Sequence, residues 1–234
     1  MKNNNIDTAL VLAAGFGRRM LPLTKNKPKP LIEVNNRALI DYCINSLKKS
    51  GIKKIIVNVH YQSEQIIHYL KKNNPEITIS NESKKLLDTG GGIKKALSLV
   101  IAKNILVMNS DVLWNNYASR SINSLIAKFN DKNMDSLLLT TKLENADGYS
   151  GKGDFTKDSK NLLKRYSHDQ SAKPLVYCGM QIINRKQYEK YNSDVFSANK
   201  IWDQNIAKKR LFTVVTTKKF NHVGTKDSVV RLNK

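Results

Sequence analysis

The sequence predicts an α/β fold in which a mainly parallel sheet carries helices on both faces. Residues 8–14 form an almost continuous apolar run that ends in glycine, which is typical of a strand buried on both sides of a parallel sheet. Segments with apolar residues at helical spacing then alternate with β-branched runs, and repeated strand–helix units build parallel sheets. The 234 residues, 40% of them hydrophobic, suffice for one large domain or two small ones.

The first half of the chain alternates regularly between helices and strands. Residues 39–50 carry apolar side chains at helical spacing, Gly51 favours the end of that helix, and the β-branched run 55–59 follows as a strand. The same alternation continues to residue 108. We expect further helices over 62–72 and 93–101, and further strands over 77–80 and 105–108.

The second half is less regular. We expect helices over 120–129, 185–191 and 199–209, strands over 136–141, 175–183 and 211–217, and a short helix at the end of the chain. The polar, glycine-rich stretch 145–158 predicts hairpins and loops. Because no low-complexity linker separates the halves, we predict one domain whose second half forms a lid or substrate side on the first.

The charge and the cysteine content limit the function classes. Lysine and arginine exceed aspartate and glutamate by 40 to 19, so the net charge of +21 favours polyanionic partners. The lysines are scattered singly or in pairs, which indicates a solvated surface and argues against a nucleic-acid-binding tail. Cys43 and Cys178 are too few for a four-cysteine zinc site, so we expect a reducing, cytoplasmic environment. No apolar run is long enough to predict a membrane span.

A predicted strand that runs directly into a glycine-rich, basic loop is the strongest functional signal. Gly15 and Gly17 allow positive φ and lack side chains, so backbone N–H groups can converge on phosphate oxygens while nearby cations compensate the charge. The loop cations are Arg18, Arg19 and Lys29. Met20 occupies the third glycine position of the dinucleotide-binding motif and no GxxxxGK[ST] string occurs, so neither a Rossmann fingerprint nor a P-loop is predicted.

Two further segments are expected near this loop. Residues 89–92 read Thr-Gly-Gly-Gly before an amphipathic run that begins at Ile93, so we expect the glycines at a helix N-terminus, where bare backbone can approach a base or a ribose. Asp111 follows the strand 105–108, and ligands of open α/β sheets bind beyond the carboxyl ends of strands. Gly15 and Asp111 should therefore face one crevice, where a carboxylate beside phosphates is a suitable Mg²⁺ ligand. Simple helix caps are the alternatives for both segments.

Together these motifs resemble the sugar-phosphate nucleotidyltransferases. Residues 12–31 match the family signature of LxxGxGxRM, a proline–threonine element and PKPL. Within the family the chain is most similar to the small bacterial N-acetylmuramate-1-phosphate uridylyltransferases of peptidoglycan recycling, which also show TGGGI, N-[GS]-D and GxGDF elements. The corresponding segments here are 89–93, 109–111 and 151–155.

The resemblance implies a Rossmann-like, GT-A-like fold over a single domain of residues 1–234, with a central mixed, mostly parallel sheet flanked by helices. Residues 1–115 would bind the nucleotide and residues 116–234 the sugar phosphate. The implied reaction joins an NTP, with UTP favoured, to a sugar 1-phosphate, with N-acetylmuramate 1-phosphate favoured. Its products are an NDP-sugar and pyrophosphate, its cofactor is Mg²⁺, and its partners are these small molecules.

The resemblance also implies roles for individual residues. Catalysis would depend on Arg19, Lys29 and Asp111, with Asp111 as the Mg²⁺ ligand. The residues expected to bind the nucleotide are Leu12, Ala13, Ala14, Gly15, Gly17, Arg18, Thr89, Gly90 and Gly91. The residues expected to bind the sugar phosphate are Asp154, Gly179 and Asp203.

One position departs from the family pattern. The family supplies a second metal-binding carboxylate in a D-x-GT element, whereas this chain reads His222-Val-Gly-Thr. Imidazole is a poor match for a hard, oxygen-preferring ion such as Mg²⁺. Three interpretations of His222 are open: it contacts phosphate, it is structural while Mg²⁺ relies on Asp111, water and phosphates, or it marks a site that has lost its activity.

Other functions are compatible with the same motifs. Glucose- or mannose-1-phosphate nucleotidyltransferases and phosphocholine cytidylyltransferases are the enzyme alternatives, and they would differ in the acceptor pocket. The alternative from another class is a degenerate nucleotidyltransferase domain that binds nucleic acid through its positive charge, with an affinity that falls steeply with salt.

Overall fold

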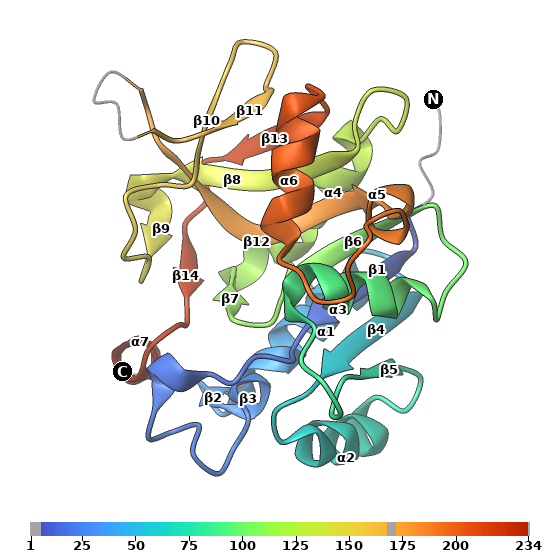
Figure 1. The fold of residues 1–234 in the computed structure, drawn as a ribbon. Coiled ribbons are helices and arrows are strands. Elements are labelled where there is room, and N and C mark those ends of the chain that lie inside the picture. Colours follow the sequence, from blue (N-terminus) through green and yellow to red (C-terminus); the bar gives the residue numbers. More distant parts are fainter. Residues whose placement is uncertain (1–5, 168–171, 234) are drawn as a thin grey trace.

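The computed structural model describes residues 6–167 and 172–233 (Figure 1). Within these ranges a nine-stranded mixed sheet runs through the molecule, and the helices cover both of its faces. The strands of this sheet are β1 (Thr8–Leu12), β4 (Lys54–Val59), β5 (Thr78–Asn81), β6 (Asn104–Asn109), β8 (Ser136–Lys142), β10 (Phe155–Lys157), β11 (Leu163–Arg165), β12 (Leu175–Asn184) and β13 (Leu211–Thr216). The predicted α/β class with a mixed central sheet is confirmed.

The sheet has a parallel part and an antiparallel part. Strands β6, β1, β4 and β5 are parallel neighbours, and Val11 of β1 lies in register with Val57 and Met108. Strand β12 then pairs antiparallel with β6, β8 and β10, and β13 adds to β8 in parallel. The carboxyl ends of β1 and β6 therefore lie side by side, and this edge is where the predicted glycine loop and Asp111 begin.

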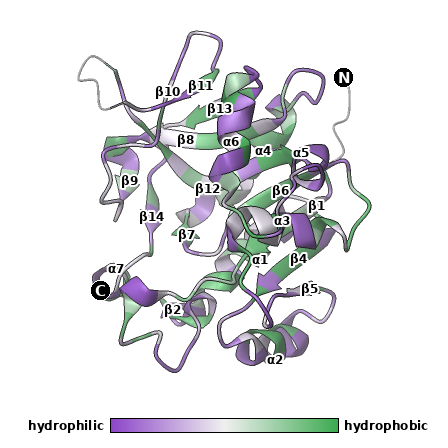
Figure 2. Ribbon diagram, in the orientation of Figure 1, coloured by the Kyte–Doolittle hydropathy of each residue, from purple (hydrophilic) through white to green (hydrophobic). Residues whose placement is uncertain are grey.

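The helices form one layer on each face of the sheet. They are α1 (Leu39–Lys49), α2 (Ser63–Asn73), α3 (Asp88–Leu97), α4 (Ala118–Lys128), α5 (Arg185–Glu189) and α6 (Ala198–Ala207), and α7 (Lys226–Leu232) follows near the end of the chain. Leu10 packs with residues of α3, α5 and α6, whereas Ala9 and Val11 pack with residues of α1, α2 and α4. Both faces of β1 are therefore buried, which explains its continuous apolar run. Figure 2 shows the hydrophobic residues concentrated in the strands, for example β4 and β8.

Several short elements were not predicted. A three-stranded sheet joins β7 (Val112–Leu113), β14 (Phe220–His222) and β9 (Ala146–Asp147), and β2 (Glu33–Val34) pairs with β3 (Arg37–Ala38). The 3₁₀ turns are η1 (Arg18–Met20), η2 (Lys29–Leu31), η3 (Asn115–Tyr117) and η4 (Leu143–Asn145). Elements of two or three residues are too short to show a hydrophobic period. The pairing of β14 with β7 matters most, because it brings residue 222 beside residue 112.

The remaining sequence expectations concern the cysteines and the membrane. Cys43 and Cys178 are both buried and free, so neither thiol is part of a disulfide. None of the helices formed by the described residues combines the length and the apolar content needed to cross a bilayer.

Candidate active site

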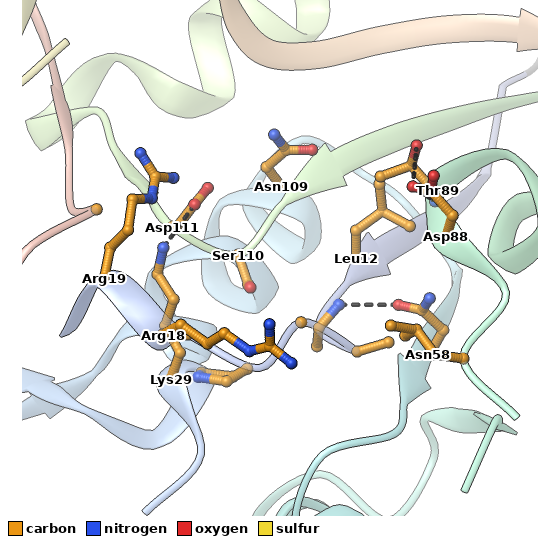
Figure 3. Close-up of a pocket in the computed structure, with 17 residues that line it drawn as sticks. Leu12, Arg18, Arg19, Lys29, Asn58, Asp88, Thr89, Asn109, Ser110 and Asp111 are labelled. Atoms are coloured by element: carbon orange, nitrogen blue, oxygen red, sulfur yellow. Dashed lines mark hydrogen bonds and ion pairs between the residues drawn. The ribbon is translucent and has the colours of Figure 1, made fainter. Parts of the chain in front are cut away.

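A cavity of about 380 Å³ opens at the carboxyl ends of β1 and β6. Gly17 and Asp111 both line it, so the predicted juxtaposition of the glycine loop and the carboxylate is found in the structure. We call it the first cavity. The other predicted residues that line it are Leu12, Ala13, Ala14, Gly15, Arg18, Arg19, Lys29 and Thr89. Figure 3 shows Arg19, Lys29 and Asp111 grouped at one end of the cavity and Leu12, Asn58, Asp88 and Thr89 at the other.

The glycine loop is anchored by buried residues that are part of the same motif. Gly17 has a φ of +65°, and a Cβ atom there would lie 3.0 Å from Cγ2 of Thr24 and 3.1 Å from Cβ of Lys29, so any side chain would be crowded and its backbone strained. The hydroxyl of Thr24 donates a hydrogen bond of 2.9 Å to the Gly17 carbonyl oxygen. Met20 is fully buried in the cluster that contains Leu39. The signature residues of the loop thus hold its backbone in place beside the cavity.

Three cations of the loop line the first cavity, and they differ in exposure and in their partners. Arg18 and Arg19 are exposed at the mouth, and the guanidinium of Arg18 lies 4.9 Å above the centre of the Phe16 ring. Lys29, in η2, is only 13% exposed, and its Nζ donates to Oδ2 of Asp111 at 2.7 Å. An anion entering this cavity would therefore meet one ion-paired ammonium group and two exposed guanidinium groups.

Asp111 is the most strongly perturbed carboxylate among the described residues that line this cavity. Nε2 of His222 lies 3.5 Å from the same Oδ2 atom that accepts from Lys29. Burial alone raises the pKa of Asp111, but the interactions with His222 and Lys29 outweigh burial and hold that pKa well below its usual range. Asp111 is thus an anion at any physiological pH, although its side chain is only 21% exposed.

His222 is held beside Asp111 by backbone pairing. Strand β14 places His222 opposite Val112, and the Val223 N–H donates a hydrogen bond of 2.8 Å to the Asp111 carbonyl oxygen. A side chain at Gly224 would lie 2.7 Å from Cε1 of the His222 ring, so this glycine leaves space for the imidazole. Residue 222 therefore lies beside Asp111, with an imidazole where the family pattern implies a carboxylate.

The structure also identifies polar residues that sequence reasoning missed. The Ala13 N–H donates to Oδ1 of Asn58 at 2.8 Å, and Nδ2 of Asn58 donates to Oε1 of the buried Glu82 at 2.7 Å. Burial raises the pKa of Glu82. Asn58 lines the first cavity and fixes the backbone that follows β1. An asparagine inside an apolar strand was the available signal, because a buried amide needs partners.

The Thr-Gly-Gly-Gly segment differs from the expectation. Helix α3 begins at Asp88, not at Ile93, so Gly90, Gly91 and Gly92 lie inside its first turns and are buried. A Cβ atom at Gly90 would lie 2.4 Å from the Phe196 ring, and one at Gly91 would lie 2.0 Å from the Asp194 carbonyl oxygen. Their small size serves close packing against 194–196. Thr89 lines the cavity, whereas Gly90 and Gly91 are not among its lining residues.

A second cavity of about 600 Å³ adjoins the first and is built mainly from the antiparallel half of the molecule. The residues shared by the two cavities are Leu12, Arg19, Asp88, Thr89 and Asn109. Gly179 lines the second cavity with a φ of +72°, where β12 changes register between Tyr177 and Gln181. A Cβ atom at Gly179 would lie 2.7 Å from Cγ2 of Val112.

The two predicted aspartates of this half have different positions. Asp154 lines the second cavity, and its oxygens accept hydrogen bonds from the Tyr149 hydroxyl at 2.9 Å and from the Tyr177 N–H at 2.8 Å. Asp203 is not among the residues lining either cavity, and its Oδ1 accepts from Nε of Arg165 at 2.8 Å. Arg165, which the sequence did not single out, is the member of that pair that lines the second cavity.

The fold and the two cavities define a class of protein. An open α/β sheet presents a glycine loop, three cations and an ionised aspartate at its carboxyl edge, and a second pocket adjoins the first. Such an arrangement suits a nucleotide-binding transferase with an adjacent acceptor. Residues 8–152 match the family model for nucleotidyl transferases.

Known relatives agree with this class. The chain is 33% identical over 221 residues to the N-acetylmuramate alpha-1-phosphate uridylyltransferase of Caulobacter vibrioides, covering 92% of this chain and 91% of that protein. It is 31% identical to the catalytic subunit beta of mannose-1-phosphate guanylyltransferase from Dictyostelium discoideum, covering 74% of this chain and 47% of that protein. The chain therefore belongs to the nucleotidyl transferase family and is a sugar-phosphate nucleotidyltransferase.

Solved structures share the fold. HddC from Yersinia pseudotuberculosis, complexed with GMP-PN, has a TM-score of 0.76 at 21% identity, with 97% of this chain and 98% of that chain covered. The inositol-1-phosphate CTP transferase from T. maritima has a TM-score of 0.75 at 15% identity, with 98% of this chain and 97% of that chain covered. At these identities the similarity concerns the fold alone.

Proposed function

We propose that this enzyme transfers a uridylyl group from UTP to N-acetylmuramate 1-phosphate, forming the UDP-sugar and pyrophosphate in peptidoglycan recycling. The observation that carries the proposal is the contact between the two cavities, since Arg19, Asp88, Thr89 and Asn109 line both of them. A nucleotide in the first cavity and a sugar phosphate in the second would meet beside Asp111. The near full-length similarity to the Caulobacter vibrioides uridylyltransferase supports this choice of substrates.

The reaction needs charge neutralisation more than proton transfer. An oxygen of the sugar 1-phosphate attacks the α-phosphorus of the NTP, and the bond from that phosphorus to the departing pyrophosphate breaks in line. Because the attacking phosphate is already an anion at neutral pH, no general base is required. Arg19 and the N–H groups of the glycine loop bind the β and γ phosphates, and Lys29 holds the attacking phosphate near the α-phosphorus.

The donor set of the first cavity fits Mg²⁺ held mainly by substrate. Proteins often hold this ion with one or two carboxylates plus phosphate oxygens. Asp111 supplies one ionised carboxylate, and the described residues contain no group of three or more His, Cys, Asp or Glu side chains suited to a metal. Bound Mg²⁺ would neutralise the phosphate charge. His222 then orients Asp111 and competes with Lys29 for the same oxygen atom, Oδ2.

A panel of substrates tests the proposal. UTP, CTP, GTP, ATP and dTTP are each combined with the 1-phosphates of N-acetylmuramate, N-acetylglucosamine, glucose and mannose, and pyrophosphate release is measured with Mg²⁺. We expect the highest kcat/KM for UTP with N-acetylmuramate 1-phosphate. A higher value for any other pair, or no turnover with all of them, contradicts the proposal.

Mannose-1-phosphate guanylyl transfer is the second candidate. It is favoured by the similarity to the Dictyostelium discoideum guanylyltransferase subunit, although this chain spans only 47% of that protein. GTP with mannose 1-phosphate is therefore the decisive competitor within the same panel.

A further inference from the structure

One cation that lines the second cavity, Arg165, lies on a strand far from the glycine loop. Among the described residues that line this cavity, Arg19 and Arg165 carry permanent positive charge. Arg19 lies where the two cavities meet, whereas Arg165 ends β11, and β10, β12 and β6 separate β11 from β1 in the sheet. At about 4.8 Å per strand these two strands are on the order of 19 Å apart. Arg165 is thus placed for an anionic group other than the reacting phosphates.

The guanidinium of Arg165 is held in one orientation by the protein. Its Nε donates to Asp203 at 2.8 Å, and its Nη2 donates to Oδ1 of Asn199 at 2.9 Å. The group lies 4.9 Å above the Phe155 ring centre and 5.7 Å from that of Trp202. Because these contacts restrict its rotation, ligand binding would cost little side-chain entropy.

The Arg165 guanidinium can still donate hydrogen bonds to a ligand. No described residue accepts a hydrogen bond from its Nη1, and the Arg165 side chain is 37% exposed. The Asp203 side chain is 54% exposed, so solvent weakens its electrostatic attraction to the Arg165 guanidinium. An N–H group of an ionised guanidinium makes a strong, charge-assisted hydrogen bond to a carboxylate, so Nη1 is a suitable donor to a carboxylate on the ligand.

We propose that Arg165 binds a carboxylate substituent on the acceptor sugar and thereby selects sugar 1-phosphates that carry a carboxylate over those that lack one. Asp203 is the positioning residue that holds the guanidinium. Asp154, whose oxygens already accept from Tyr149 and Tyr177, repels that carboxylate and favours sugar hydroxyls on its own side of the cavity. The inference rests on the proposed function in taking the second cavity as the acceptor pocket; N-acetylmuramate carries a carboxylate on its lactyl ether, whereas N-acetylglucosamine does not.

The experiment compares sugar 1-phosphates that carry a carboxylate with related sugar 1-phosphates that lack one. The pairs are N-acetylmuramate with N-acetylglucosamine and glucuronate with glucose, and Kd is measured by calorimetry in the presence of Mg²⁺ and a non-hydrolysable UTP analogue. The variants are Arg165→Gln, Arg165→Lys and Asp203→Asn. Lys164→Gln is the matched control, because Lys164 is an exposed cation on the same strand that lines neither cavity.

Loss of a charged hydrogen bond predicts a Kd for the carboxylate-bearing sugar that is about 10- to 100-fold higher in Arg165→Gln. The Kd for the sugar without the carboxylate should change less than about twofold, Arg165→Lys should recover part of the preference, and Asp203→Asn should lose part of it. Equal changes for both members of a pair, or no preference in the unmodified enzyme for either pair, would overturn the inference. Failure of the proposed function is recognised separately, as absence of pyrophosphate release from UTP and N-acetylmuramate 1-phosphate.

Discussion

The two cavities are built in different ways. The first is lined largely by one continuous segment, residues 12–30, which follows β1 and is joined by Asp111 at the end of the neighbouring parallel strand. The second takes most of its lining from segments between residues 149 and 222, brought together by antiparallel pairing and by α6. The lining of the first cavity is therefore encoded largely in one short segment, whereas the second cavity requires side chains from distant parts of the chain.

This difference predicts that substitutions in the two cavities have separable kinetic effects. Residues where the cavities meet should affect turnover of every substrate pair. Lys29 and Asp111, which are assigned to the reacting phosphates, should do the same, whereas the other residues that line only one cavity should change KM for one substrate. The following predictions test that separation, beginning with the largest expected effect.

Asp111→Ala and Lys29→Ala should each lower kcat by roughly 100-fold or more, the scale seen when one preorganised charge-stabilising group is lost. Since Lys29 and Asp111 form an ion pair of 2.7 Å, the double variant should lose less than the product of the two single effects. Pyrophosphate release under saturating substrates measures the effect. Lys27→Ala, which removes an exposed cation paired with Glu33, is the control. Near-normal turnover of either single variant would remove Lys29 or Asp111 from the mechanism.

Gly179→Ala should raise KM for the sugar 1-phosphate by roughly tenfold or more and leave KM for the NTP unchanged. The added methyl group would lie 2.7 Å from Val112, and the φ of +72° strains any residue other than glycine, so β12 must shift beside the second cavity. Steady-state kinetics with each substrate varied in turn would show the difference, and a thermal melt would confirm folding. An equal rise in both KM values would break the distinction between the cavities.

Asn58→Ala should affect the other substrate: it should raise KM for the NTP by about tenfold and leave KM for the sugar 1-phosphate unchanged. The variant removes the acceptor for the Ala13 N–H and the donor to Glu82, so the backbone after β1 loses its fixed position. The KM for the sugar phosphate is the internal control. If only the acceptor KM rises, the assignment of the first cavity to the nucleotide is wrong.

The smallest expected effects concern the pH dependence of stability. The pKa of Glu82 is raised in the native state and that of Asp111 is lowered, so their contributions to stability change with pH in opposite directions. The pKa of Glu82 is raised above 4.5, so the native state holds its proton longer than the unfolded chain, and this contribution to stability is lost as the pH rises through the folded pKa. The pKa of Asp111 is lowered below 3.8, so its contribution is present above that value and lost on acidification. Thermal melts of Glu82→Gln and Asp111→Asn between pH 3 and 7 measure both effects. The melting temperature of Glu82→Gln relative to the unmodified protein should rise with pH, and that of Asp111→Asn should fall. A difference that does not change with pH would contradict either assignment.

The boundaries of the helices and strands show how much of the fold can be predicted from local sequence patterns. The strands β1, β4 and β6 and the helices α1, α2 and α4 occupy nearly the predicted ranges, because their hydrophobic periods are set by burial against one sheet. Helix α3 begins at Asp88, before the predicted range 93–101, whose start reflects the low helix propensity of glycine. Packing against Phe196 overrides that preference, and residue 196 lies too far along the chain for local sequence to reveal it. The proposed division into a nucleotide half and a sugar-phosphate half stays a prediction.

The sequence by itself determined the glycine loop with its cations and the position of Asp111 after β6, because each of these features depends only on a strand and the residues that directly follow it. Only the tertiary structure placed His222 beside Asp111 and Asn58 beside the Ala13 N–H. It also decided that Arg165 lines the second cavity, whereas its ion-pair partner Asp203 does not. These contacts join residues separated by between 38 and 111 positions. Which of them form is decided by strand order and register, and the free energy that selects one register comes from burying the whole sheet.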